Sequence, residues 1–135
     1  MSRRRGWWYH TRDIVRNYPT LWENLQELRR PSLVPGTEGV PGGSELGRST
    51  EQLALRVLPP VKQLDLAAVQ TAIRKTQALP DGKARLQIID LTHWKGSHTI
   101  VGAAAEAHVS TRTAYRWQND FFLLVARIRG LIDVR

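Results

Sequence analysis

The chain has 135 residues, carries 20 Lys and Arg against 12 Asp and Glu, and contains no Cys. That length favours a single domain, and the lack of Cys excludes disulfide scaffolds, thiol catalysis and Cys-ligated metal sites. The formal net charge of +8 indicates a polyanionic partner, most often nucleic acid.

The sequence carries no recognisable membrane or secretion signal. No apolar run approaches the roughly 20 residues that a membrane span needs. Arg3, Arg4 and Arg5 lead into Trp7 and Trp8 rather than into the apolar core of a signal peptide. We therefore expect a cytoplasmic protein that does not bind a membrane.

Residues 1–30 predict two short helices. Pro19 disfavours a helical conformation at Tyr18 and is expected to end the first helix there. Thr20 and Glu23 have the spacing of a capping box, which predicts that a second helix starts at this point. The apolar stripe of this second helix consists of Leu21, Leu25 and Leu28.

Residues 31–50 are predicted to form a flexible linker or a long surface loop, because eight of these twenty residues are Gly or Pro. The linker separates the N-terminal segment from a body that spans residues 51–135. Ser49 and Gln52 predict a further capping box at the start of this body. Pro59-Pro60 is expected to break or kink any helix that precedes it.

The body is predicted to be helical throughout. Apolar residues at helical spacing predict helices from about residue 64 to 79 and from about residue 83 to 94. One face of the first helix combines Leu64, Ala68 and Ala72. No segment alternates apolar and polar residues with a period of two, so the expected fold is a small all-α domain.

The most specific pattern spans residues 99–119. Thr99 is placed to cap one short helix, and Ser110 is placed to cap the next. His108 stands where the turn between two such helices usually has Gly. This pattern is typical of the helix-turn-helix motif, in which the second helix enters the major groove of DNA.

The predicted second helix has Arg, Thr and Tyr on its outer face. Arg112 and Arg116 share a face, and either can bond guanine bidentately or pair with a phosphate. Hydroxyl groups near the helix start can bond phosphates. An Ala-rich helical hairpin inside a bundle is the alternative interpretation. The candidate DNA-contacting residues are Thr99, His108, Ser110, Thr111, Arg112, Thr113, Tyr115, Arg116 and Asn119.

The last helix also carries a wide apolar stripe, at steps of three and four residues. The stripe consists of Ala114, Trp117, Phe121, Leu124, Ile128 and Leu131. It is expected either to pack against the helix at 64–79 or to form a dimer seam, and a stripe of this width can do both. A homo-oligomer through the C-terminal helix is therefore one expectation.

Three features together carry a family resemblance: the aromatic segment before Tyr18-Pro19, the Gly/Pro-rich stretch 31–50, and the pattern from Thr99 to Trp117. With these features the chain resembles the small phage late-gene transcription regulators of the RinA and ArpU type. Their C-terminal part is similar to the region-four domain of bacterial sigma factors. The resemblance implies a sequence-specific activator that binds double-stranded DNA and works with bacterial RNA polymerase at the nucleoid of the host cell.

Other classes of function stay open. A small-terminase subunit for DNA packaging would also place a helix-turn-helix beside a helical oligomerisation segment, and would form rings. A recombination or transposon accessory protein is a third DNA-directed class. Four large aromatic residues suit either a protein-interaction module or the core of the chain itself. They are Trp7, Trp8, Tyr9 and Trp22.

The sequence gives little support to an enzyme. Asp90, His93 and His98 are the candidate metal ligands, but their spacing crosses a helix end and Gly96 and lacks the His-Glu-x-x-His pattern. The glycines of the linker are not followed by the Lys-Ser/Thr pair of a phosphate-binding loop. We expect no catalytic residues, no metal and no cofactor.

Overall fold

The computed structural model describes residues 6–29 and 58–132, and every regular element in these two ranges is helical. The helices are α1 (Gly6–Arg29), α4 (Pro60–Gln77), α5 (Gly82–Ile89), a π-helical turn η1 (Asp90–Trp94), α6 (Ile100–Glu106) and α7 (Thr111–Arg129). The all-α prediction is confirmed. The predicted linker at 31–50 and the predicted capping box at Ser49 lie outside the described residues.

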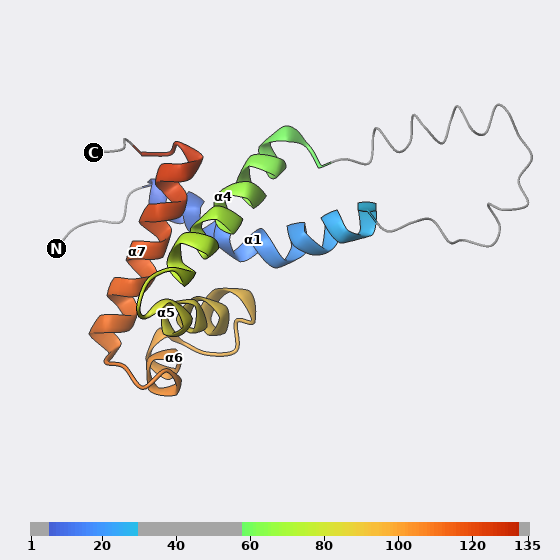
Figure 1. Ribbon diagram of the computed structural model, residues 1–135. Helices are drawn as coiled ribbons and strands as arrows, with labels where there is room; N and C mark the ends of the chain where they lie inside the picture. Colours follow the sequence, from blue (N-terminus) through green and yellow to red (C-terminus); the bar gives the residue numbers. More distant parts are fainter. Residues whose placement is uncertain (1–5, 30–57, 133–135) are drawn as a thin grey trace, which may run out of the picture.

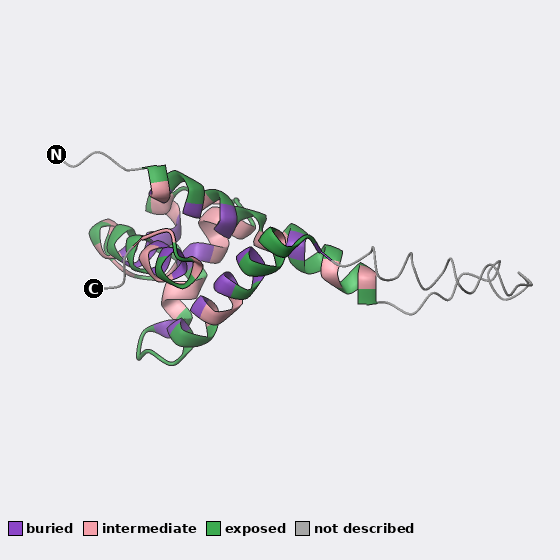
Figure 2. Cartoon of the chain, turned by 90° about the horizontal axis from the view of Figure 1, so that it is seen from above, coloured by how far each residue is buried: buried purple, intermediate pink, exposed green. Residues whose placement is uncertain are grey.

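Three long helices, α1, α4 and α7, pack against one another, and the short helices α5 and α6 pack against the N-terminal half of α7 (Figure 1). The main core lies where the long helices meet and includes Val15, Val69, Phe122 and Val125, all with no exposed surface. Figure 2 shows the buried residues on the sides of the helices that face one another. The predicted C-terminal stripe therefore contributes Trp117 and Phe121 to the interior of this chain.

The N-terminal segment is one helix, not the two that the sequence predicted. Pro19 lies inside α1, and Thr20 is an exposed residue in the middle of the helix rather than a cap. Proline has no N–H, so a proline at position 19 leaves the carbonyl of Val15 without its helical partner. The indole Nε1–H of Trp94 donates to this carbonyl at 2.9 Å. A donor from η1 thus replaces the missing hydrogen bond, and the helix continues through Pro19.

The helix predicted at 64–79 begins earlier, at Pro60, because proline is well suited to the first turn of a helix. Leu64 was expected to share a face with Ala68 and Ala72, but it is 55% exposed whereas both alanines are buried. The first turns of α4 instead bury the side chains of Asp65 and Leu66. Asp65 accepts a hydrogen bond from Nε of Arg129 at 2.7 Å, which ties α4 to the end of α7.

The second predicted helix of the body, 83–94, changes its winding before it ends. Residues up to Ile89 are α-helical, and Asp90–Trp94 form a π-helical turn. The N–H of Lys95 bonds to the carbonyl of Asp90 at 2.7 Å, five residues back. This turn carries His93 and Trp94, which both contact the main core. None of the described helices has the length and apolar character needed to cross a membrane.

Candidate nucleic-acid interface

The helices α6 and α7 and the turn between them occupy the region predicted as 99–119. Thr99 caps α6, because its side chain accepts a hydrogen bond from the N–H of Gly102 at 3.1 Å. Ala103 and Ala104 are buried, and small side chains of this kind allow α7 to cross α6 closely. The predicted role of Thr99 as a cap is confirmed. Thr99 is exposed at the start of α6.

The turn between α6 and α7 contains a residue in the left-handed backbone conformation, at the position where a helix-turn-helix usually has Gly. His108 has a φ of 60°, and no other described residue except glycine has a positive φ. The N–H groups of His108 and Val109 bond back to the carbonyls of Ala105 and Ala104 at 3.1 and 3.0 Å. His108 is exposed, so its imidazole is free to meet a ligand approaching the turn.

Ser110 caps α7 as predicted. Its Oγ accepts a hydrogen bond from the N–H of Thr113 at 3.0 Å, and the two hydroxyls lie 2.9 Å apart. The cap fixes the start of the helix and its orientation relative to the turn. Both hydroxyls therefore act in the cap first, whereas the sequence had suggested phosphate contacts for them. Thr111, between them, is half-buried.

The inner side of α7 is packed against α5 and α6. Ala114 and Trp117 are buried in a cluster with Ile88, Ala103 and Ala104. This cluster packs against one side of α7, and Arg112 and Arg116 lie on the exposed side. The predicted inward placement of Ala114 and Trp117 is confirmed.

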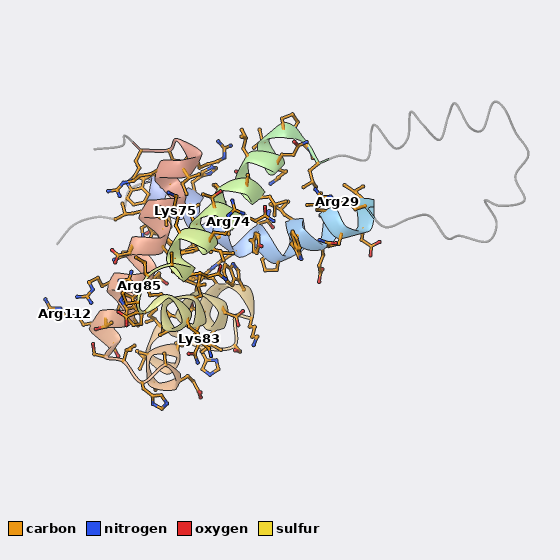
Figure 3. All side chains as sticks on the ribbon, in the orientation of Figure 1. Arg29, Arg74, Lys75, Lys83, Arg85 and Arg112 are labelled. Carbon is orange, nitrogen blue, oxygen red and sulfur yellow. The ribbon has the colours of Figure 1, made fainter. Side chains whose placement is uncertain are left out.

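The outer face of α7 carries two arginines with free guanidinium groups. Arg112 and Arg116 are exposed and lie one helical turn apart. Neither forms an ion pair with residues 6–29 or 58–132. Figure 3 shows Arg112 pointing away from the helical body near the start of α7. Tyr115, between the two arginines in sequence, is 41% exposed.

Asn119, which the sequence predicted to face DNA, is exposed and also accepts a hydrogen bond from α1. The indole Nε1–H of Trp8 donates to Oδ1 of Asn119 at 3.3 Å. Trp8 itself is buried, and its ring lies 5.1 Å from that of Phe122. The contact places α1 against α7 one turn beyond Arg116, so Asn119 marks the end of the open face rather than its centre.

A helix that the sequence had not connected to this face supplies one further cation. Arg85 of α5 lies 5.3 Å above the ring of Trp117 and 3.4 Å from the carboxylate of Asp120. Asp120 lies one turn after Arg116, so Arg85 borders the outer face of α7. Lys83, two residues earlier on α5, is exposed but does not share a helix face with Arg85 (Figure 3). No periodicity in the sequence could have paired α5 with α7, because the contact is tertiary.

A second interaction missed by the sequence joins three elements through His93. Nε of Arg16 donates to Nδ1 of His93 at 3.1 Å, and Nε2 of His93 lies 2.6 Å from Oε1 of Gln118. Arginine can only donate, so Nδ1 is unprotonated and Nε2 carries the proton that Gln118 accepts. Burial lowers the pKa of His93; the hydrogen bond to Gln118 opposes this, and the charges of Arg16 and Arg12 add to the lowering.

The three candidate metal ligands do not converge. Asp90 lies 3.4 Å from Nζ of Lys95, His93 is bound between Arg16 and Gln118, and His98 faces Ser97 and Glu106. Within the two described ranges no three His, Asp or Glu side chains are grouped so that they could hold a metal ion.

Comparisons of the chain with protein-family models, with curated proteins and with solved structures find no match. The resemblance to phage late-gene regulators therefore stays a prediction from the sequence.

Proposed function

We propose that this chain is a DNA-binding protein that inserts the N-terminal half of α7 into the major groove of duplex DNA. The observation that carries the proposal is the pair Arg112 and Arg116. Both guanidinium groups are exposed, lie on one face at a helix start, and have no ion-pair partner among the described residues. Arginine is the residue that most often reads guanine in the major groove.

The arrangement of α6, the turn and α7 supports this geometry. In helix-turn-helix proteins the first helix crosses the DNA backbone and the second enters the groove N-terminus first. Ser110 caps the start of α7, and the buried cluster at Ala114 holds the inner side of its N-terminal half. The opposite side of these turns, with Arg112 and Arg116, is exposed. The positive end of the helix dipole and the exposed His108 would then face phosphates on one side of the groove.

We assign different roles to Arg85 and Tyr115, which lie near Arg112 and Arg116. Arg85 is already engaged with Asp120 and stacked on Trp117, so it orients the α5–α7 contact more than it reads DNA. Tyr115, with its exposed ring, suits a contact to a phosphate or a sugar.

A matched set of charge deletions tests the proposal. A binding site is first selected from a pool of random duplexes, and fluorescence anisotropy then measures the affinity of each variant for it. Arg112→Ala and Arg116→Ala should each weaken binding, whereas Arg29→Ala is the control. This control removes the same charge, but Arg29 lies at the end of α1, away from Arg112 (Figure 3). Equal effects of all three substitutions would contradict the proposed face.

The finer form of the proposal is a transcriptional regulator, in line with the family resemblance, that acts with bacterial RNA polymerase. A packaging subunit of the small-terminase type is the alternative. Mapping of bound DNA in a host cell, combined with transcript measurements, separates the two. Promoter-proximal binding with induced transcripts supports a regulator, and binding confined to a packaging site would contradict it.

A further inference from the structure

A pocket with a volume of about 310 Å³ opens between the middle of α1 and the π-helical turn η1. No residue of α6 or α7 lines it, so it is separate from the proposed DNA-binding face. Its surface is mostly apolar, and two acidic residues and one lysine lie among the aromatic residues that line it. The lining residues are Tyr18, Pro19, Trp22, Glu23, Asp90, Trp94 and Lys95.

One wall of the pocket is positioned by the hydrogen bond between Trp94 and the carbonyl of Val15, which also replaces the helical bond that Pro19 cannot make. Trp94 is fixed by its hydrogen bond to the carbonyl of Val15, and its ring lies 5.6 Å from that of Tyr18 at 44°. The turn Asp90–Trp94 departs from regular α-helix, and π-helical turns occur frequently at functional sites. Trp22, one turn after Tyr18, leaves 39% of its surface exposed. A large aromatic residue exposed at the edge of a pocket is well placed to contact a ligand.

The chemistry of the walls favours a cation. The faces of Trp and Tyr rings carry negative electrostatic potential and attract ammonium and guanidinium groups. Glu23 and Asp90 add two negative charges, against one positive charge from Lys95. The chain as a whole has a net charge of +8, so this pocket has the opposite sign to the rest of the molecule. Lys95 places its ammonium group 3.4 Å from the Asp90 carboxylate, so these two charges balance each other and Glu23 supplies the remaining negative charge of the lining.

We propose that this pocket binds an arginine side chain from a partner protein. A guanidinium group is planar, stacks on aromatic faces and pairs bidentately with a carboxylate, so it can use the rings and Glu23 at once. The chain makes a similar contact internally, where Arg85 lies 5.3 Å above the Trp117 ring. Because the pocket and α7 are separate, the partner and DNA could be bound together.

The test is a titration of the full-length protein with two peptides, followed through the indole N–H signals of Trp22 and Trp94 by NMR. One peptide is acetyl-Gly-Gly-Arg-Gly-Gly-amide, and in the other citrulline replaces Arg. Citrulline has nearly the same shape but no charge. We expect saturable shifts of both signals and a dissociation constant about fivefold lower for the Arg peptide. Equal affinities for the two peptides would overturn the proposal.

Substitutions that leave the core intact identify the site. Trp22→Ala should abolish the preference for Arg over citrulline, and Glu23→Gln should reduce it. The matched control is Asp13→Asn, which removes the same charge from an exposed position on the same helix and should leave the preference unchanged. Lys95→Gln should tighten binding of the Arg peptide, because it removes the competing ammonium group. Weaker binding by Lys95→Gln, or an equal loss in Asp13→Asn and Glu23→Gln, would contradict the assignment.

Discussion

The hydrogen bond from Trp94 to the carbonyl of Val15 should be measurable as a coupling between Trp94 and Pro19. Trp94→Phe keeps an aromatic ring beside Tyr18 but removes the Nε1–H that lies 2.9 Å from this carbonyl. In the wild-type background the carbonyl then has no donor from the helix either, because residue 19 is proline. Leaving such a group unsatisfied costs about 1–3 kcal/mol of unfolding free energy, and the lost ring area adds to this.

Pro19→Ala, combined with Trp94→Phe, completes a double-mutant cycle. Alanine restores an N–H at position 19, which can donate to Val15 in the ordinary helical way. Trp94→Phe should therefore cost at least about 1 kcal/mol less in the Pro19→Ala background, while the loss of ring area is the same in both and cancels. Urea unfolding followed by far-UV circular dichroism measures all four proteins. An equal cost of Trp94→Phe in the two backgrounds would refute the role assigned to this bond.

Three further predictions concern the packing around α7 and α5. Gly82→Ala should destabilise the protein by about 1–3 kcal/mol in a thermal melt, because a Cβ at this position would collide with the backbone of Thr76 and Gln77; an unchanged melting temperature would contradict the close approach. Trp117→Ala should cost about 3–5 kcal/mol in urea unfolding as a truncation of a buried residue, and an unaltered curve would contradict its inward placement. His93 has a lowered pKa in the folded protein, so its contribution to stability should be complete above pH 6.5 and decline as the pH falls from there through the folded-state pKa. His93→Gln should reduce this decline in unfolding free energy, and an identical pH dependence in both proteins would contradict it.

The local signals of the sequence predicted the α6–α7 region well. Thr99 and Ser110 were identified as caps from their residue type and position, and His108 was identified as the residue in the turn. These features depend on interactions within three or four residues, which the sequence displays directly. The inward placement of Ala114 and Trp117 followed from the helical period in the same way.

The errors arose where a distant residue supplied the decisive contact. Pro19 was expected to end a helix, and the rule failed because Trp94, 79 residues along the chain from Val15, provides the missing donor. Asn119 is exposed, as the prediction of an outer-face residue requires, but its hydrogen bond from Trp8 of α1 was missed. Leu64 was placed on one face with Ala68 and Ala72 but is exposed, because α4 turns Asp65 inward to meet Arg129 of α7. The apolar periodicity of one helix does not show how the neighbouring helices are oriented against it.

The central claim is that α7 presents Arg112 and Arg116 to duplex DNA. Its most direct test is the affinity of the Arg112→Ala and Arg116→Ala proteins for a selected duplex, measured beside Arg29→Ala. We expect each substitution on α7 to cost about 1–3 kcal/mol if that arginine contacts a base, with Arg29→Ala close to wild type. Wild-type affinity should also fall steeply as salt is raised, since phosphate contacts release counterions. Unchanged affinity in both α7 variants would contradict the account.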